Sequence, residues 1–156
     1  MDLHEDCASL AFLLGTWRGR GEGEYPTIEP FPYLEEVTFG HVGKPFLTYT
    51  QKTRHAETNQ PLHAEAGYLR AVGDERLEFV LSQPSGIVEL HSGRLVGQRL
   101  ELTLHAVHTT PAAKSVTDVV RDIGVDGDAL SYTVAMAAVG EPLTHHLKAT
   151  LQRAAE

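Results

Sequence analysis

The feature that most constrains the fold is a two-residue alternation of apolar and polar side chains, which runs through most of the chain after Gly15. Alternation of this kind is typical of β-strands, because successive side chains of a strand point to opposite faces. The alternating segments are rich in β-branched and aromatic residues and are separated by turn residues such as Ser92-Gly93. They predict ten strands, at about 16–25, 34–41, 45–54, 62–71, 76–83, 86–92, 99–107, 115–125, 129–138 and 143–152.

Short strands without long helices between them exclude a parallel α/β fold, in which helices connect the strands. We therefore expect an all-β fold, a ten-stranded antiparallel β-barrel of the calycin type, because closing the sheet removes its exposed edges. Asp126-Gly127 is a hairpin signal within this series, and residues 109–114 are the best candidate for a longer loop. A barrel with more than about eight strands is too wide for its own side chains to fill, so we expect a ligand cavity.

The residues before Gly15 follow a different pattern and predict one short N-terminal helix over residues 2–14. An apolar stripe at helical spacing runs along this segment, and acidic residues near its start suit the helix dipole. Gly15 follows the stripe and is a candidate stop signal. The stripe consists of Leu3, Cys7, Leu10, Ala11 and Leu14.

Length and charge limit the functions that are open to the chain. With 156 residues, no repeat and no linker, residues 1–156 are expected to form a single domain. A net charge of −8 disfavours nucleic acid and anionic membrane surfaces as partners. The single cysteine, Cys7, requires no oxidising compartment, and the longest apolar run, residues 10–14, is too short to span a bilayer. We therefore expect a soluble, cytoplasmic protein.

A run of glycines stands out at the start of the first predicted strand. Gly15, Gly19, Gly21 and Gly23 share one face of that strand with Trp17. Glycine weakens a strand, so this density indicates sharp bending, close approach of another chain segment, or a flat ligand pressed against the backbone. The Gly-x-Trp motif also resembles the start of calycin barrels such as lipocalins and fatty-acid carriers, in which the tryptophan closes one end of the barrel.

Nine histidines are many for a chain of this length, and most are interpreted as ordinary solvated residues. His105 and His108 lie on opposite faces of one strand, which disfavours a shared zinc ion. The alternation in the last strand places His145 on the apolar face with Leu147 and His146 on the other face. No nucleophile motif, phosphate-binding loop or paired metal-ligand spacing is present. The histidines expected to be solvated near strand ends or turns are His41, His55, His63 and His91.

Blocks of sequence over roughly residues 9–153 resemble the nitrobindins, a family of haem-containing β-barrels that are also described as peroxynitrite isomerases. The family's Gly-x-Trp-x-Gly-x-Gly signature is matched by Gly15, Trp17, Gly19 and Gly21. The other matching blocks keep the same order along the chain. They are Tyr25-Pro26-Thr27-Ile28, residues 31–36, residues 41–45, residues 67–70, Pro84-Ser85-Gly86, Ala112-Ala113-Lys114 and the segment 136–151.

The resemblance implies a haem b in one open end of the barrel, one per subunit, with His146 as the axial ligand of the iron. It also places Thr27 and Lys114 near the haem. Family members bind nitric oxide, and the ferric form turns peroxynitrite into nitrate, so the implied substrates are small molecules. Because the family pattern selects His146 where the alternation selects His145, we expect a β-bulge or a less apolar inner face near the barrel mouth.

Three questions stay open at the level of sequence. Lys114 is compatible with a haem propionate partner, with local attraction of an anion, or with a solvated loop. The barrel is compatible with an enzyme, with a haem or nitric oxide sensor or carrier, and with a calycin-type lipid carrier. An outward-facing row of leucines on the last strand would suit a homodimer.

Overall fold

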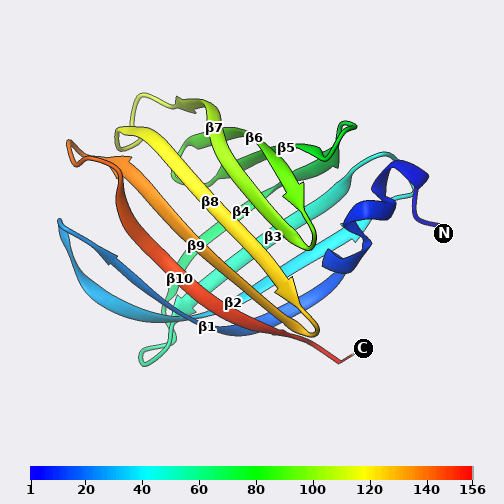
Figure 1. Cartoon of the computed structure of the whole chain (residues 1–156). Helices are drawn as coiled ribbons and strands as arrows, with labels where there is room; N and C mark the ends of the chain where they lie inside the picture. The colour runs from blue at the N-terminus through cyan, green and yellow to red at the C-terminus, as the bar shows by residue number, and fades with distance from the viewer. Residues whose placement is uncertain (156) are drawn as a thin grey trace.

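A computed structural model describes residues 1–155, and Glu156 lies outside the described residues. The chain forms one closed antiparallel barrel, in which each strand pairs with its sequence neighbours and β1 pairs with β10 (Figure 1). The all-β, ten-stranded calycin-like barrel and its short N-terminal helix are thereby confirmed. The strands are β1 (Gly15–Tyr25), β2 (Ile28–His41), β3 (Leu47–His55), β4 (Pro61–Ala71), β5 (Arg76–Gln83), β6 (Ile87–Val96), β7 (Arg99–Thr109), β8 (Val116–Asp126), β9 (Ala129–Ala138) and β10 (Thr144–Arg153).

The second strand starts earlier than the sequence pattern predicted, at Ile28 and not near residue 34. Pro30 and Pro32 made this segment look like a connection, because proline cannot donate to a strand ladder. The pairing between β2 and β3 begins only at Tyr33, so residues 28–32 pair with β1 alone. Residues 28–32 therefore form a strand end that pairs on one side only, and proline is tolerated at such a position.

The N-terminal segment forms a 3₁₀ helix, η1 (Glu5–Leu13), within the predicted residues 2–14. Its buried residues are Cys7, Leu10 and Leu13, at the three-residue spacing of a 3₁₀ helix. The expected stripe was therefore right at Cys7 and Leu10, but Leu13 is buried in place of Ala11 and Leu14. Gly15 does not follow the helix as a stop signal; it starts β1 with a positive φ of 118°.

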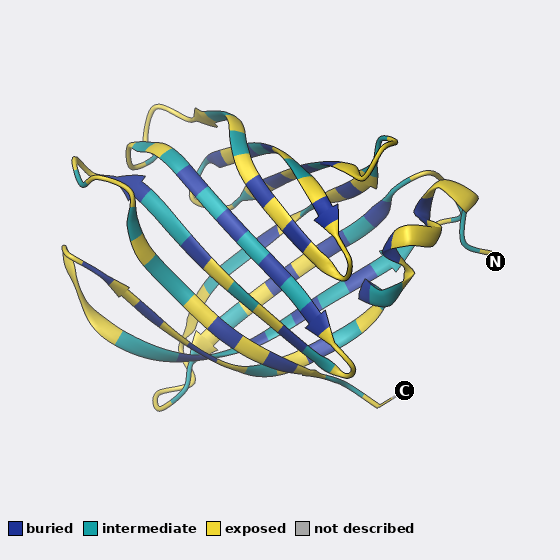
Figure 2. Cartoon of the chain, in the orientation of Figure 1, coloured by how far each residue is buried: buried dark blue, intermediate teal, exposed yellow. Residues whose placement is uncertain are grey.

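The two ends of the barrel differ (Figures 1 and 2). Helix η1 covers one end, where its buried face joins a core cluster that includes Trp17, Leu47 and Leu69. The β1–β2, β3–β4, β5–β6, β7–β8 and β9–β10 connections gather at the other end, which no helix covers. No helix among residues 1–155 is long and apolar enough to cross a membrane.

Candidate functional site

The glycines of β1 make room for aromatic rings from β2. Gly21 pairs with Tyr33 and Gly23 pairs with Phe31, and a Cβ atom added to either glycine would collide with the ring of its partner. A Cβ at Gly19 would collide with the backbone of β10 at Thr150. Of the sequence-based explanations for the glycine run, close approach of another chain segment therefore accounts for these three positions.

Trp17 lies on the same strand at the covered end of the barrel. Its side chain is fully buried, and its indole N–H donates a 2.8 Å hydrogen bond to the carbonyl oxygen of Leu13 in η1. The Arg153 guanidinium lies over the indole ring, 4.1 Å from its centroid, which is a cation–π contact. Trp17 thus joins the first strand, the helix and the last strand at the end opposite to the open mouth.

The last strand contains a β-bulge at His146. His145 pairs with Ala135 of β9 and Leu147 pairs with Val134, so His146 is an extra residue without a partner on β9. The alternation predicted that His145 shares the face of Leu147. Because of the bulge it does not, and His145 is exposed. Leu147 and Leu151 face inward with the core, which also corrects the expectation of an outward leucine row and removes that argument for a homodimer.

The bulge places the His146 ring in a defined setting at the open end. Its Nδ1 lies 2.9 Å from the carbonyl oxygen of Glu24, and its ring contacts that of Tyr25 edge to face, with 5.4 Å between centroids. A carbonyl can only accept a hydrogen bond, so Nδ1 carries the proton and Nε2 keeps its lone pair. Burial lowers the pKa of His146, and the charges of His63 and Arg121 act in the same direction. The imidazole is therefore neutral near pH 7, with Nε2 available as a ligand.

The two other residues that the resemblance selected lie at the same end of the barrel. Thr27 is exposed in the β1–β2 turn, and Lys114 is exposed in the connection between β7 and β8. Within residues 1–155, Lys114 forms no ion pair or side-chain hydrogen bond. The structure thus brings Thr27, Lys114 and His146 to one mouth but shows no contact among them.

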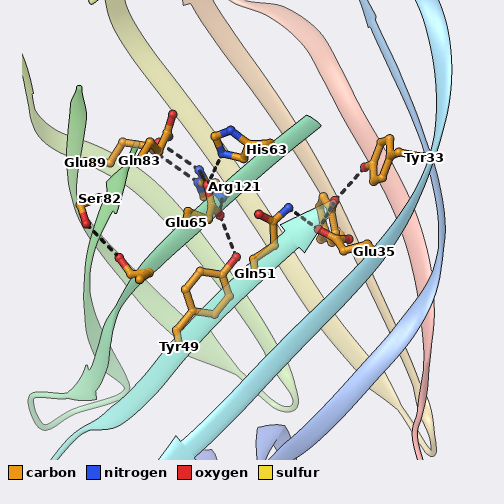
Figure 3. Close-up of polar contacts among 12 residues, drawn as sticks. Tyr33, Glu35, Tyr49, Gln51, His63, Glu65, Ser82, Gln83, Glu89 and Arg121 are labelled. Carbon is orange, nitrogen blue, oxygen red and sulfur yellow. Dashed lines mark hydrogen bonds and ion pairs between the residues drawn. The ribbon is translucent and has the colours of Figure 1, made fainter. Parts of the chain in front are cut away.

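A buried polar network that the sequence reading missed crosses the interior next to this mouth (Figure 3). Arg121 of β8 lies between Glu65 of β4 and Glu89 of β6, and all three are less than a tenth exposed. The guanidinium donates to Glu65 at 2.9 and 3.2 Å and to Glu89 at 2.9 and 3.0 Å. Burial by itself would raise the pKa of Glu65 and Glu89, but Arg121 outweighs it and holds both values below the usual range. Both carboxylates are therefore ionised.

Two histidines belong to this network, which corrects their interpretation as solvated residues. His91 is only 3% exposed, and its Nε2 lies 2.7 Å from Glu89. His63 is half-buried, with Nε2 3.1 Å from Glu65. Buried polar side chains need hydrogen-bond partners, and the carboxylates of Glu65 and Glu89 supply them for these two histidines. The Nδ1 atom of His91 is also buried and has no partner among the described residues.

A second group of polar residues surrounds Glu35, which is 4% exposed on β2. Its Oε2 atom accepts hydrogen bonds from Gln51 at 2.6 Å and from the Tyr132 hydroxyl at 3.0 Å. The Tyr132 hydroxyl also lies 2.7 Å from that of Tyr33. Burial raises the pKa of Glu35 to about 7, since no cation contacts this carboxyl as Arg121 contacts Glu65.

One sequence signal could have revealed these residues. Glu35 is two residues from Tyr33 and from Val37, and Glu89 is two residues from Ile87 and from His91. Residues two apart in a strand share a face, so both glutamates occupy inward positions. A charged residue at an inward position is costly unless it is paired inside the barrel. The pairing partners come from distant strands, and for that reason the sequence alone does not identify them.

Comparison with known proteins gives consistent results over nearly the whole chain. Residues 6–153 match the family model described as "THAP4-like, heme-binding beta-barrel domain". The chain is 57% identical over 158 aligned residues to peroxynitrite isomerase 1 of Mycolicibacterium paratuberculosis, covering 97% of each chain. It is 52% identical to the peroxynitrite isomerase of Nocardia farcinica, covering 97% of this chain and 92% of the relative.

Solved structures agree with the observed architecture. The crystal structure of Rv2717c from Mycobacterium tuberculosis superposes with a TM-score of 0.92 at 50% identity and covers 99% of this chain and 100% of that one. The S-type phycobiliprotein lyase of Guillardia theta has a TM-score of 0.65 at 8% identity, over 93% of this chain and 90% of the other, and shows only that the fold is shared. The nitrobindin resemblance is thus confirmed, and the chain belongs to the family of THAP4-like, haem-binding β-barrel domains.

Proposed function

We propose that this protein binds one haem b per chain at the open end of the barrel, through His146, and isomerises peroxynitrite to nitrate in the ferric state. The observation that carries the proposal is the setting of His146. Its Nδ1 is bound to the Glu24 carbonyl and its Nε2 is free, in a chain more than half identical to proteins named peroxynitrite isomerase. We further propose that the same site binds nitric oxide.

The residues around His146 fit a haem ligand. A histidine that ligates a metal commonly donates its other ring N–H to a carbonyl or carboxylate, which fixes the tautomer and the ring orientation. Glu24 supplies that carbonyl, and the edge of Tyr25 limits rotation of the ring. Because burial lowers the pKa of His146, protons compete weakly with a metal for Nε2 at neutral pH.

Apolar side chains next to His146 suit a flat hydrophobic group. Leu147 and Phe31 are half-buried and pack against the core, and both strands that carry them pair with β1 at Gly23. The Phe31 and Tyr33 rings contact each other at a tilt of 40°, with 6.0 Å between their centroids. Lys114 and Thr27 are exposed at the rim of the open end, and an ion pair of Lys114 with a haem propionate is part of the proposal.

Haem held by His146 would supply the iron chemistry for a small ligand such as peroxynitrite or nitric oxide. The protein holds His146 neutral and oriented, and it keeps the interior carboxylates paired. Glu65 and Glu89 are both bound to Arg121, so neither carboxylate is free to act as a metal ligand.

The lipid-carrier alternative is disfavoured by Arg121. A fatty-acid carboxylate inside a barrel needs a buried cation as its partner. Arg121 is the buried cation among residues 1–155, but four of its hydrogen bonds already go to Glu65 and Glu89. A lipid carboxylate would have to displace one of these carboxylates and leave it buried and unpaired.

The test separates an enzyme from a sensor. The purified protein is reconstituted with ferric haem, and the Soret band and a one-to-one stoichiometry are measured. Stopped-flow absorbance then follows peroxynitrite decay at catalytic protein concentrations, and ion chromatography quantifies nitrate and nitrite. We expect a Soret band, a decay rate proportional to the protein concentration and nitrate as the product. Haem binding with unchanged peroxynitrite decay would identify a nitric oxide or haem sensor instead, and absence of a Soret band would overturn the haem proposal.

A further inference from the structure

Tyr33, Tyr132 and Glu35 form a directed hydrogen-bond chain inside the barrel. The Tyr132 hydroxyl donates to Glu35 Oε2 at 3.0 Å and lies 2.7 Å from the Tyr33 hydroxyl. A phenol has one proton to donate, and that of Tyr132 is directed at Glu35, so Tyr33 donates to Tyr132. The chain therefore runs from Tyr33 through Tyr132 to a carboxyl group.

The chain ends on a group that can take up a proton. Glu35 is 4% exposed, and its second oxygen, Oε1, is buried without a hydrogen-bond partner among the described residues. The titratable and charged groups whose charges or hydrogen bonds act on it are Tyr132 of β9, Glu65 of β4 and Arg121 of β8, with Tyr33 next to it on β2. The pKa of Glu35, raised by burial to about 7, means that the ionised form is present at neutral pH and can accept a proton.

The other buried tyrosines lack such an acceptor. The Tyr25 hydroxyl donates to the carbonyl of Met136 at 3.0 Å, and a backbone carbonyl does not take up a proton. Tyr49 donates to Glu65 at 2.7 Å, but Arg121 holds that carboxylate in its ionised form and keeps its pKa far below the usual range. Among these tyrosines, Tyr132 alone donates to a carboxylate that ionises near neutral pH.

The tyrosine pair lies near the wall that carries His146. Tyr33 packs over Gly21, which pairs with Ala149 of β10, and Tyr132 pairs with the same Ala149 from β9. His146 lies three residues before Ala149 on β10, next to the mouth. Tyr132 therefore lies on the strand that pairs with the one carrying His146, and the pair lies further from the mouth than His146 does.

We propose that Tyr132 and Tyr33 are a redox-active pair that reduces one-electron oxidants such as nitrogen dioxide, with Glu35 as the proton acceptor. Nitrogen dioxide takes one electron from Tyr132 and becomes nitrite, while the phenolic O–H bond breaks and its proton moves to Glu35 Oε2. A neutral tyrosyl radical remains, and Tyr33 donates a hydrogen bond to its oxygen. A second nitrogen dioxide adds to the ring carbon next to the one that bears the oxygen, and transfer of the proton from that carbon to the oxygen gives 3-nitrotyrosine.

The inference rests on the proposed function in one respect, namely that peroxynitrite chemistry at the mouth delivers nitrogen dioxide. The first experiment therefore avoids haem and peroxynitrite. Nitrogen dioxide is generated by pulse radiolysis in a solution of the full chain, the tyrosyl radical is followed by absorbance, and nitrated residues are mapped by mass spectrometry. Tyr68, which is 55% exposed, serves as the internal reference for modification from solution.

The variants Glu35→Gln and Glu36→Gln form the matched pair. Glutamine accepts the Tyr132 hydrogen bond but not the proton. Glu35→Gln should therefore lower the yield of nitrated Tyr132 and Tyr33 relative to Tyr68 about tenfold, because a charged acceptor that takes up the proton is replaced by a neutral amide that cannot. Glu36 points outward and pairs with Arg18 and Lys52, so Glu36→Gln should leave the ratio unchanged. Near-ultraviolet circular dichroism confirms that both variants are folded.

Equal ratios in the wild type and Glu35→Gln, or nitration confined to Tyr68, would overturn the inference. A second arm repeats the mapping with the haem-loaded protein and peroxynitrite. Modification of Tyr132 in the radiolysis arm together with no nitrate formation in the second arm would support the tyrosine pair and contradict the proposed isomerase activity. Nitrate formation together with an unmodified Tyr132 in both arms would support the isomerase activity and contradict the inference about the tyrosine pair.

Discussion

The covered end and the open end of the barrel use the same alternating strands but contain different side chains. At the covered end, inward positions hold Trp17, Leu47 and Leu151, and the helix adds Cys7, Leu10 and Leu13. Towards the open end, inward positions hold Glu35, Glu65, Glu89 and Arg121 and lead to the bulge at His146. The difference indicates that apolar packing at one end stabilises the barrel, so that the other end can hold buried charge and the half-buried imidazole of His146.

The largest expected effect is at the open end. His146→Ala should abolish stable haem binding while the barrel stays folded, because it removes the imidazole whose Nε2 is free. His145→Ala is the matched control, since His145 is exposed on the outer side of the same bulge, and it should keep a near-normal Soret band. Titration with haem, followed by absorbance and by far-ultraviolet circular dichroism, measures both properties. The reverse outcome would show that the alternation, and not the family pattern, selects the ligand.

At the covered end, Trp17→Ala should lower the free energy of unfolding by about 3–5 kcal/mol, the usual range for removing a buried tryptophan. The indole is fully buried, its N–H is bonded to Leu13, and Arg153 packs on its face. Chemical denaturation measures the loss. Ile28→Ala, at a position that is 47% exposed in β2, should change stability by less than about 0.5 kcal/mol. A similar loss for both variants would contradict the contrast between the ends.

The buried carboxyl of Glu35 should make the stability depend on pH. The pKa of Glu35 is raised from 4.5 to about 7 in the folded protein, so the folded state keeps a proton that the unfolded state has lost between these values. The free energy of unfolding should therefore fall as the pH rises from about 4.5 to 7 and then level off, by at most about 3 kcal/mol. In Glu35→Gln this decrease should disappear.

The measurement is denaturation at a series of pH values, with Glu36→Gln as the control for an outward carboxylate. Glu36 has a pKa lowered by its hydrogen bonds to Arg18 and Lys52, so its stabilising contribution is lost only as the pH falls through the acid range. A pH profile of Glu35→Gln that coincides with that of the wild type would show that Glu35 ionises at its ordinary value.

The boundary between the two ends is tested by Gly21→Val, for which we expect a loss of about 2 kcal/mol in the free energy of unfolding, within the usual range for overpacking a core. A side chain at this position collides with the Tyr33 ring. The double variant Gly21→Val/Tyr33→Ala should recover part of the loss, because the space occupied by the ring is vacated. An unchanged melting temperature and full haem occupancy for Gly21→Val would show that the ring can move aside without cost.

The fold could be predicted from the sequence because one signal repeats along the chain. Most strands showed their two-residue period and were followed by turn residues, as in the hairpin at Asp126-Gly127. The prediction of a turn at Ser92-Gly93 was wrong, because both residues pair within β6, which continues to Val96. The start of β2 was missed because Pro30 and Pro32 mask a strand that pairs on one side only. The expected stripe of η1 was right at Cys7 and Leu10 but ended on Leu14 where Leu13 is buried, because a 3₁₀ helix repeats every three residues and the expectation used the α-helical period.

The candidate site was less predictable, because it depends on contacts between distant strands. The family resemblance selected His146, whereas the alternation selected His145, and the difference is a single extra residue in β10. His91 was interpreted as solvated because nothing near it in the sequence identifies Glu89 and Arg121 as parts of one buried cluster. The roles of Thr27, Lys114 and His146 toward haem stay predictions.

The bulge at His146 also has a consequence for protein engineering. Because His146 has no pairing partner on β9, its side chain can be exchanged without shifting the register of the strands that close the barrel. A cysteine or methionine there would present a different donor atom from the same backbone position. The proposed ligand position is thus separate from the paired residues that determine how the barrel closes.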